Sequence, residues 1–459
     1  MNLSLNDVKK LENAEIFFVE RLKGKKFNAV STDSRTVAEN NIFFALCGEK
    51  FDGHKFIGDV IGKKAAAVVV ESQWYQQNAD IVERSTCSAV VVPDSTKALG
   101  TLAKIYRSKF SIPVLAVGGS NGKTTTKEMI SAVLQEKFRV LKTEGNLNNH
   151  IGVPQTLFKL TPRHEIAVLE LGTNHFGELK YLCDIAAPTH ALITNIGKEH
   201  LEFFGDENGV AQEETELFRT VTADGFAFIN CDDRFLVKAG EKNHRALRYG
   251  MSPSADIRAI KIRASESGEP IFTVSRKSRK DRMQIRLSVA GLHQTTNALA
   301  AVAVGTEFRV QKKKICRALE TFTATHKRME TITRNGITIL NDTYNANPDS
   351  VIAALKTFKA MKVGGKKVVV LADMLELGGK AEHEHAKIGL EVSNLDFEYL
   401  FTFGPLTRFT HEASKLAFAE HFDSKEALID SLKSQLAPGD AALVKGSRGM
   451  KMEEVVAQL

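Results

Sequence analysis

A strand–turn–helix segment at residues 114–129 constrains the fold of this chain more than any other feature. It reads VLAVGGSNGKTTTKEM, in which an apolar strand candidate leads into a glycine-rich turn, then into Lys123, Thr124 and a helix. Because the glycines lack a Cβ, the backbone N–H groups around them can close on phosphate oxygens. The helix beginning near Thr124 directs its N-terminal dipole at the same anion. The segment therefore predicts a phosphate cradle within an α/β fold.

The side chains of this turn fit a nucleotide. Lys123 is placed to reach the β- and γ-phosphates, and the Thr124 hydroxyl is placed to bind Mg²⁺. The strict P-loop pattern requires a glycine five residues before Gly122, where this chain has Val117. The alternative is an ordinary strand–helix turn with a solvated lysine. We predict a nucleotide site that comprises Gly118, Gly119, Ser120, Asn121, Gly122, Lys123, Thr124 and Thr125.

Length and composition bound the class of protein. A chain of 459 residues is too long for one core and suits about three domains of ordinary size. No apolar run approaches the ~20 residues that cross a bilayer, and residues 1–10 contain no signal-peptide hydrophobic region. Five scattered cysteines, odd in number and without metal-like spacing, indicate a reducing compartment. We predict a cytoplasmic protein without a transmembrane segment, and we expect a monomer.

The basic residues do not indicate a nucleic-acid partner. The net charge is +7, and much of it lies in one run at residues 275–282. That run has no interleaved aromatic residues and lies between alternating segments at 271–274 and 283–289. We interpret it as a solvated hairpin loop and expect no binding to nucleic acid.

The order of apolar runs predicts three α/β domains, at 1–110, 111–323 and 324–459. In the central domain, near-continuous apolar strands are separated by helices, which indicates a mostly parallel sheet covered on both faces. Helices are expected at 96–110 and 294–308. The strand candidates are 42–46, 65–70 and 89–92 in the first domain, 114–117, 166–169, 191–194 and 226–229 in the second, and 337–340, 367–371, 399–403 and 441–444 in the third.

The strands of the central domain all end in polar residues. The first ends in the phosphate turn, the second ends in Glu170, and the third leads to His200. In open parallel sheets, ligands bind beyond the carboxyl ends of the strands. We therefore expect Gly119, Glu170 and His200 to meet at one site, although they are far apart in sequence.

The third domain repeats this pattern as an open, Rossmann-like sheet with a ligand edge of its own. Its strands end in the polar segments 341–348, 372–376 and 445–448. In the first of these segments, Asn347 fits a helix cap and Pro348 fits the first helical turn.

Several independent motifs of this chain resemble those of the Mur ligase family, the ATP-dependent amide-forming enzymes of peptidoglycan synthesis. The resemblance runs from about residue 31 to residue 454, and the motifs follow the family order. They are STDSR (31–35), FFAL (43–46), DGH (52–54), GNLNNHIGVP (145–154), ELG (170–172), NIG (195–197) with HLE (200–202), GLHQTTNALA (291–300), HKR (326–328), DTYNANP (342–348), DMLELG (373–378) and KGSR (445–448).

The resemblance implies a fold and a reaction. It implies a small N-terminal α/β domain that grips the UDP end of the substrate, a central P-loop-type domain and a C-terminal ligase domain. The YNANP string at 344–348 is the most specific motif, and it implies the family member that joins D-alanyl-D-alanine (D-Ala-D-Ala) to a UDP-MurNAc-tripeptide. In this reaction ATP, with two Mg²⁺ ions, phosphorylates a carboxylate, and an amine then attacks the acyl phosphate.

Two alternatives remain open at this stage. The first is the related family member that adds the third amino acid of the peptide. The second is a catalytically silent nucleotide-binding regulator. Two departures from the expected patterns favour it: Val117 in the phosphate turn, and Glu214 at a position where related ligases carry a lysine.

The resemblance also implies catalytic and metal-binding residues. Lys123, Glu170 and His200 are the expected catalytic residues. Glu170 and Thr124 would hold one Mg²⁺, because a hard cation prefers oxygen ligands, and His200 would support a second ion. The alternatives are a capping or solvated carboxylate at Glu170 and a structural histidine at His200.

Further residues match nucleotide and substrate contacts of the family. Arg328 and Asp342 match nucleotide-contacting residues, and Asn297 is expected near the base. Turn formation is the alternative for the adjacent Asn148 and Asn149, and surface ion pairing is the alternative for Lys445 and Arg448. The expected substrate-binding residues are Ser34, Arg35, Asn148, Asn149, Tyr344, Asn345, Asn347, Lys445 and Arg448.

One position departs from related ligases, which carry a lysine after the HLE motif that CO₂ modifies to a metal-binding carbamate. An ungapped alignment of residues 209–218 places Glu214 there. A glutamate supplies a carboxylate without modification, although that group lies about 4 Å closer to the backbone. We hypothesise that Glu214 replaces the modified lysine as a metal ligand, with a solvated helix residue as the alternative. His383 and His385 point to different helix faces, so we expect no shared metal there.

Overall fold

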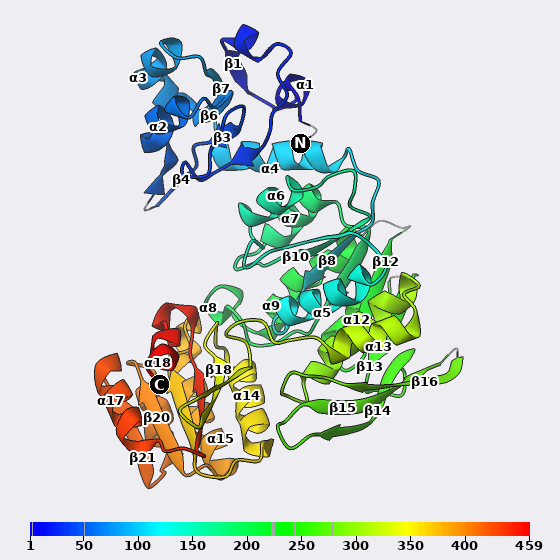
Figure 1. Cartoon of the computed structure of the whole chain (residues 1–459), viewed down its shortest axis with the longest axis vertical. Helices are drawn as coiled ribbons and strands as arrows, with labels where there is room; N and C mark the ends of the chain where they lie inside the picture. The colour runs from blue at the N-terminus through cyan, green and yellow to red at the C-terminus, as the bar shows by residue number, and fades with distance from the viewer. Residues whose placement is uncertain (2, 50, 222–224, 243–244, 278) are drawn as a thin grey trace.

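The computed structural model describes residues 1–459 except residues 2, 50, 222–224, 243–244 and 278. The chain forms three α/β units in sequence order, each built on its own sheet (Figure 1). The predicted α/β class is confirmed. The three main sheets lie within the predicted ranges 1–110, 111–323 and 324–459.

The N-terminal unit contains a five-stranded sheet in the order β1-β7-β6-β3-β2, in which only β1 is antiparallel to its neighbour. Its strands are β1 (Glu15–Phe17), β2 (Val30–Ser31), β3 (Ile42–Phe44), β6 (Ala67–Glu71) and β7 (Ser88–Val92), with a separate hairpin of β4 (Cys47–Gly48) and β5 (Phe51–Asp52). Its helices are α1 (Leu5–Val8), η1 (Val19–Leu22), η2 (Gly53–Phe56), α2 (Ile57–Gly62), α3 (Ser72–Glu83) and α4 (Ser95–Arg107).

The central unit contains a nine-stranded sheet in the order β16-β15-β14-β13-β12-β11-β8-β10-β9. Strands β8 to β14 pair in parallel, and β14, β15 and β16 form an antiparallel edge. The strands are β8 (Val114–Gly118), β9 (Val140–Lys142), β10 (Ile166–Glu170), β11 (His190–Ile193), β12 (Phe226–Asn230), β13 (Ala246–Gly250), β14 (Ile257–Ala264), β15 (Pro270–Arg276) and β16 (Arg279–Arg286). The helices are α5 (Lys123–Gln135), α6 (Gly152–Leu157), α7 (Glu178–Ala186), α8 (Leu201–Phe204), α9 (Glu207–Glu214), α10 (Glu216–Thr220), α11 (Arg234–Gly240), α12 (Gln294–Glu307) and α13 (Lys312–Glu320).

The C-terminal unit contains a six-stranded sheet in the order β17-β18-β22-β19-β20-β21, in which only β17 is antiparallel to its neighbour. Its strands are β17 (Glu330–Arg334), β18 (Ile337–Asp342), β19 (Lys367–Ala372), β20 (Tyr399–Phe403), β21 (Phe418–Phe422) and β22 (Ala441–Lys445). Its helices are α14 (Pro348–Ala360), η3 (Gly378–Lys380), α15 (Ala381–Asn394), α16 (Thr407–Ser414), α17 (Lys425–Gln435), η4 (Arg448–Met450) and α18 (Glu453–Gln458).

Helices cover both faces of the central sheet, as its fully buried strands require. Every residue of β8 and β10 is buried. On one face, α5 packs with α12, whose segment 298–304 is entirely buried. On the other face, α4, α6 and α7 pack together, and the Tyr106 hydroxyl donates to the carbonyl of Leu160 at 2.8 Å. Helix α4 thus joins the N-terminal unit to the central one (Figure 1).

The structure corrects the interpretation of the basic run at 275–282. Strands β15 and β16 extend into the run and pair there, for example Ser275 with Arg282, so that most of it is strand rather than loop. Ser278 lies outside the described residues. The hairpin itself is confirmed. Backbone pairing with a neighbouring strand outweighs the low strand propensity of consecutive charged residues.

Among the helices of the described residues, none has both the length and the apolar character needed to cross a membrane.

Candidate active site

Two glycines of the phosphate turn adopt backbone conformations that favour glycine. Gly119 has a φ of +110° and Gly122 a φ of +79°. A Cβ on Gly119 would lie 2.3 Å from Thr194 Oγ1 and 2.7 Å from the Thr194 backbone nitrogen. The tips of β8 and β11 therefore approach each other more closely than a side chain would permit.

A prediction follows for Gly119→Ala. The overlap with the Thr194 backbone and the positive φ should together cost about 3 kcal/mol, and the unfolding midpoint should fall by several degrees. Gly177→Ala is the matched control, because Gly177 has a φ of +88° but nothing within 4 Å of a Cβ. That control should cost about 1 kcal/mol. Equal thermal shifts for the two variants would show that the approach of Thr194 is unimportant.

The structure narrows the set of N–H groups available to a phosphate. The N–H groups of Gly119, Ser120 and Asn121 donate to Glu214 Oε2 at 2.7 Å, to the Asn195 carbonyl at 2.9 Å and to Asn195 Oδ1 at 3.0 Å. Helix α5 begins at Lys123, and the first N–H groups of a helix have no acceptor within it. The donors that face an anion are therefore those at the start of α5 rather than those of the glycine turn.

Lys123 lies among carboxylates. Its Nζ is 3.1 Å from Glu199 Oε2, and both side chains are largely buried. Burial alone would lower the pKa of Lys123, but the charges of Glu199, Glu214 and Glu170 outweigh burial and raise the pKa. The lysine is therefore a cation in this site, as phosphate binding requires.

Glu170 lies at the end of β10 and is buried. Its Oε1 accepts hydrogen bonds from Thr124 Oγ1 at 3.1 Å and from Asn148 Nδ2 at 3.0 Å. Its Oε2 has no hydrogen-bond partner among the described residues and lies 3.7 Å from Nζ of the fully buried Lys127. This carboxylate is neither solvated nor a helix cap, which excludes both predicted alternatives for Glu170.

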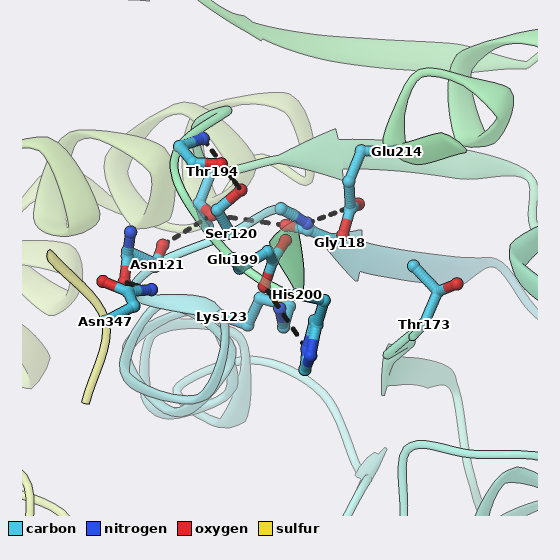
Figure 2. A network of polar contacts seen from close by, with 12 residues as sticks. Gly118, Ser120, Asn121, Lys123, Thr173, Thr194, Glu199, His200, Glu214 and Asn347 are labelled. Atoms are coloured by element: carbon cyan, nitrogen blue, oxygen red, sulfur yellow. Dashed lines mark hydrogen bonds and ion pairs between the residues drawn. The ribbon is translucent and has the colours of Figure 1, made fainter. Parts of the chain in front are cut away.

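His200 follows β11 and adopts a left-handed conformation, with φ at 47°, just before α8. Its Nδ1 lies 2.5 Å from Glu376 Oε2, which comes from the C-terminal unit. Its Nε2 lies 4.0 Å from Glu199 Oε2. Figure 2 shows Lys123, Glu199 and His200 lying together below the strand tips.

These residues line one cavity between the central and C-terminal units. Its volume is about 890 Å³, and it contains Ser120, Lys123, Glu170 and His200. Glu170 and His200 therefore meet the phosphate turn in one cavity, as expected, although the turn contributes Ser120 to the lining rather than Gly119. Of the other predicted site residues, the cavity is also lined by Asn121, Gly122, Thr124, Thr125, Asn148, Asn149, Asn297, Arg328, Asp342, Tyr344, Asn345, Asn347, Lys445 and Arg448.

Several predicted residues of the C-terminal unit that line this cavity form cation–π contacts or ion pairs. The Arg328 guanidinium lies 3.8 Å from the ring centroid of Tyr344. The buried Lys445 lies 2.6 Å from Asp342 Oδ2, so surface ion pairing does not describe Lys445. Arg448, in contrast, pairs with Glu453 at 2.9 Å and is largely exposed.

Asn347 combines two roles. Its Oδ1 accepts from the Ser350 N–H and caps α14, as the sequence predicted, with Pro348 as the first helical residue. Its Nδ2 donates to Asn121 Oδ1 at 2.9 Å, and this contact joins the C-terminal unit to the phosphate turn (Figure 2).

Five predicted site residues do not line this cavity. Gly118, Gly119 and Glu214 are buried beside it, with Glu214 on the far side of the strand tip from His200 (Figure 2). Burial raises the pKa of Glu214 to about 8, and the nearby Lys123 opposes this shift. Ser34 and Arg35 lie in the N-terminal unit, where Arg35 is exposed and pairs with Asp33 at 2.7 Å. Glu214 is fully buried, so it is not a solvated helix residue.

Sequence patterns did not single out several residues of this site. Glu199 lies beside His200 in the chain, and Lys127 lies one turn beyond Lys123 on α5. Lys198 crosses to the C-terminal unit, where its Nζ lies 2.9 Å from Glu384 and its N–H donates to Asp349 at 2.8 Å. Their positions inside the motifs were the available signal, but the partners of Lys198 lie more than 150 residues away.

The two histidines of α15 do not share a metal. His385 is buried, its Nδ1 donates to the Ala381 carbonyl at 2.7 Å, and its Nε2 accepts from the Met374 N–H at 3.0 Å. Both ring nitrogens are therefore used within the C-terminal unit, and burial lowers the pKa of His385.

The residues present fit a nucleotide with a hard cation. The start of α5 and the Lys123 cation suit phosphate oxygens. The Thr124 hydroxyl and the Glu170 carboxylate are oxygen donors, and the buried Glu170 Oε2 lacks a partner in the described structure. Together, a phosphate-binding strand–turn–helix and a second α/β sheet closing the same cavity define a nucleotide-dependent enzyme of several domains.

Comparison with known proteins specifies the family. Three family models match: the Mur ligase family catalytic domain at residues 26–107, the Mur ligase middle domain at 117–305 and the Mur ligase glutamate ligase domain at 327–448. The chain is 36% identical over 437 residues to the UDP-N-acetylmuramoyl-tripeptide–D-alanyl-D-alanine ligase of Bacillus subtilis, covering 94% of this chain and 93% of that protein. It is 34% identical to the Escherichia coli enzyme of the same name, over 94% and 93% of the two chains.

Solved structures point to the same family. A crystal structure of MurF from Acinetobacter baumannii matches with a TM-score of 0.89 and 29% identity, covering 100% of this chain and 99% of that one. MurF from Thermotoga maritima in complex with ADP matches with a TM-score of 0.83 and 27% identity, covering 94% and 96%. The chain belongs to the Mur ligase family and, within it, to the MurF group.

Proposed function

We propose that this enzyme joins D-Ala-D-Ala to a UDP-MurNAc-tripeptide at the expense of ATP, giving the UDP-MurNAc-pentapeptide of peptidoglycan synthesis. One observation carries the proposal: the phosphate turn, Glu170 and His200 share a cavity with the DTYNANP and KGSR motifs of the C-terminal unit. The similarity to the UDP-N-acetylmuramoyl-tripeptide–D-alanyl-D-alanine ligases of Bacillus subtilis and Escherichia coli supports it.

The reaction has two bond-forming steps. A carboxylate oxygen of the tripeptide attacks the γ-phosphorus, ADP leaves, and an acyl phosphate forms. The amine nitrogen of D-Ala-D-Ala then attacks the acyl carbon, the C–O bond to phosphate breaks, and the nitrogen loses a proton. Each step concentrates negative charge on phosphoryl or carbonyl oxygens, so the site needs fixed cations and N–H donors.

The protein supplies these groups from both units. Lys123 and the first N–H groups of α5 hold the β- and γ-phosphates, while Arg328 contributes a permanent, planar cation from the opposite side. Asp342 and Asn297, which line the same cavity, would contact the nucleotide. Closure of the C-terminal unit onto the central one excludes water that would otherwise hydrolyse the acyl phosphate.

Mg²⁺ would be held by Thr124 and Glu170, with His200 and Glu214 toward a second ion. When bound, it neutralises the charge of the transferring phosphoryl group. The same oxygens and ring nitrogen order the cavity through the contacts described above. The peptide and D-Ala-D-Ala would contact Asn148, Asn149, Tyr344, Asn345, Asn347, Lys445 and Arg448, and the UDP end would contact Ser34 and Arg35.

An isotope experiment tests the acyl phosphate. Tripeptide labelled with ¹⁸O in its terminal carboxylate should transfer one ¹⁸O to each inorganic phosphate released. Unlabelled phosphate would contradict the mechanism. Single amino acids in place of D-Ala-D-Ala, with the UDP-MurNAc peptide that lacks its third residue as acceptor, test the family member that adds this residue. ATP turnover without acceptor or amine would favour a regulator.

Glu214 supports a narrower proposal, that this enzyme needs no carbamylated lysine. Glu214 Oε1 is buried and has no hydrogen-bond partner among the described residues, so one oxygen remains for a cation. Its Oε2 is bonded to the Gly119 N–H. The position on the far side of the strand tip from His200 favours a contact through a bridging water over direct coordination.

We predict that ligase activity is independent of CO₂. The rate in degassed, bicarbonate-depleted buffer should stay within about twofold of the rate in bicarbonate, because Glu214 has a carboxyl group without modification. Burial raises its pKa to about 8, and a bound cation would favour the ionised form. Glu214→Lys is the matched variant, and its rate should rise when bicarbonate is added. A marked loss of wild-type rate on depletion, restored by bicarbonate, would contradict the prediction.

A monomeric state and a cytoplasmic location stay predictions.

A further inference from the structure

We propose that Glu376 of the C-terminal unit is a positioning residue for His200. The His200 ring is then oriented to bind a cation through Nε2 only when the C-terminal unit is docked against the central unit. The proposal rests on the metal role given to His200 under the proposed function. Glu376 belongs to the DMLELG motif, to which the proposed reaction gives no role.

The contact fixes one nitrogen of the ring. His200 Nδ1 lies 2.5 Å from Glu376 Oε2. The two atoms form a close ion-pair contact rather than a well-directed hydrogen bond, and the negative charge beside Nδ1 favours the neutral ring form that carries its hydrogen there and leaves the Nε2 lone pair free. Nε2 is the nitrogen on the side of Glu199, 4.0 Å away, and both residues line the cavity.

The backbone around the pair holds it in place. The Glu202 N–H, two residues after His200, donates to the Glu376 carbonyl at 3.1 Å. Both residues are left-handed, with φ at 47° for His200 and 62° for Glu376. Such conformations cost non-glycine residues about 1 kcal/mol each and persist where surrounding contacts impose them. A Cβ on Gly378 would lie 3.1 Å from Glu202 Cα, so the two chains are in close contact there.

The rest of the motif is anchored inside the C-terminal unit. Asp373 Oδ1 accepts from the N–H groups of Leu406 at 3.0 Å and Thr407 at 2.8 Å. The Met374 N–H donates to His385 Nε2, and the Leu375 N–H donates to Ser447 Oγ at 2.9 Å. These bonds explain the buried His385, because it holds the segment that presents Glu376. Hydrogen bonds within the C-terminal unit therefore hold the DMLELG segment in place.

A surface ion pair is the simpler explanation, and it makes a different prediction. The Glu376 side chain is 46% exposed, and exposed pairs contribute about 0–1 kcal/mol. If the contact served only to dock the two units, any neighbouring contact would be equivalent. Lys380 provides that comparison, because its Nζ donates to the Gly205 carbonyl at 2.5 Å across the same interface without touching His200.

Mn²⁺ binding tests the proposal. Free Mn²⁺ is measured by electron paramagnetic resonance while full-length enzyme is titrated with a non-hydrolysable ATP analogue present. Glu376→Ala should weaken one Mn²⁺ site about 10- to 100-fold, as for other partners of metal-binding histidines. Glu376→Gln should weaken that site less than Glu376→Ala, because the amide oxygen keeps a partial negative charge beside Nδ1. Lys380→Ala should match the wild type.

Three outcomes would overturn the proposal, and His200→Ala separates them. If His200→Ala loses a site and Glu376→Ala does not, Glu376 is not a positioning residue, and the proposed function stands. If His200→Ala keeps every site, the metal role of His200 is wrong. If Lys380→Ala weakens binding as much as Glu376→Ala, the contact only docks the units. The near-isosteric Glu376→Gln keeps the test valid should the alanine variant fold poorly.

Discussion

Lys123→Ala should lower kcat for ADP release by about 10³-fold, which is the largest effect that we expect from a single substitution. Lys123 is the cation at the start of α5, and three carboxylates raise its pKa. Its removal leaves the transferring phosphoryl group without its nearest fixed positive charge. A coupled assay of ADP release, with both substrates saturating, measures the change.

Two further variants make this prediction sharp. Lys123→Met keeps the apolar stem and should lose as much activity as Lys123→Ala, which separates loss of charge from loss of packing. Lys137→Ala removes a lysine just beyond the C-terminal end of α5, whose Nζ donates to the carbonyls of Phe308 and Arg309, and it should leave kcat unchanged. Retention of the wild-type rate by Lys123→Ala within threefold would contradict the account.

Glu170→Gln should lower kcat by about 10²-fold and raise the Mg²⁺ concentration for half-maximal rate by more than tenfold. The substitution preserves the size of the side chain and its hydrogen bond from Thr124. It removes the charge at Oε2, the buried oxygen that has no hydrogen-bond partner within the described structure. Rates measured across Mg²⁺ concentrations separate weaker metal binding from slower chemistry.

Glu128→Gln is the matched control. Glu128 also pairs with Lys127, at 3.0 Å, but lies outside the lining of the main cavity in the described structure. Its substitution should leave the Mg²⁺ dependence unchanged. A Glu170→Gln enzyme with wild-type Mg²⁺ dependence would show that the carboxylate at the end of β10 does not hold the metal.

Much of the central sheet could be predicted because its strands are buried on both faces. The segments at 114–117 and 166–169 are continuous apolar runs, and they became β8 and β10 with one residue added at the polar end. Strands β14 and β21 carry charges along an alternating pattern and were not recognised. For such strands, pairing with a neighbour decides the structure, and a single sequence does not show the neighbour.

The site was predictable to the extent that it follows strand ends. Glu170 and His200 were found because polar residues after buried strands meet at one edge of a parallel sheet. The pairing of His200 with Glu376 and of Lys198 with Glu384 depends on how two separate units dock, and these pairs are more than 170 residues apart. No local pattern encodes that docking. The burial of Glu214 beside the phosphate turn was missed because it depends on how α9 packs against the end of β8 within the central unit, which no local pattern shows.

The mass of the product tests the central claim most directly, namely that one cavity between the two units uses ATP to make this particular amide. The enzyme is incubated with ATP, Mg²⁺, D-Ala-D-Ala and UDP-MurNAc-tripeptide carrying either diaminopimelate or lysine as its third residue. We predict a UDP-MurNAc-pentapeptide from one of the two tripeptides, with one ADP released for each amide formed. ADP release without pentapeptide from either tripeptide would contradict the account.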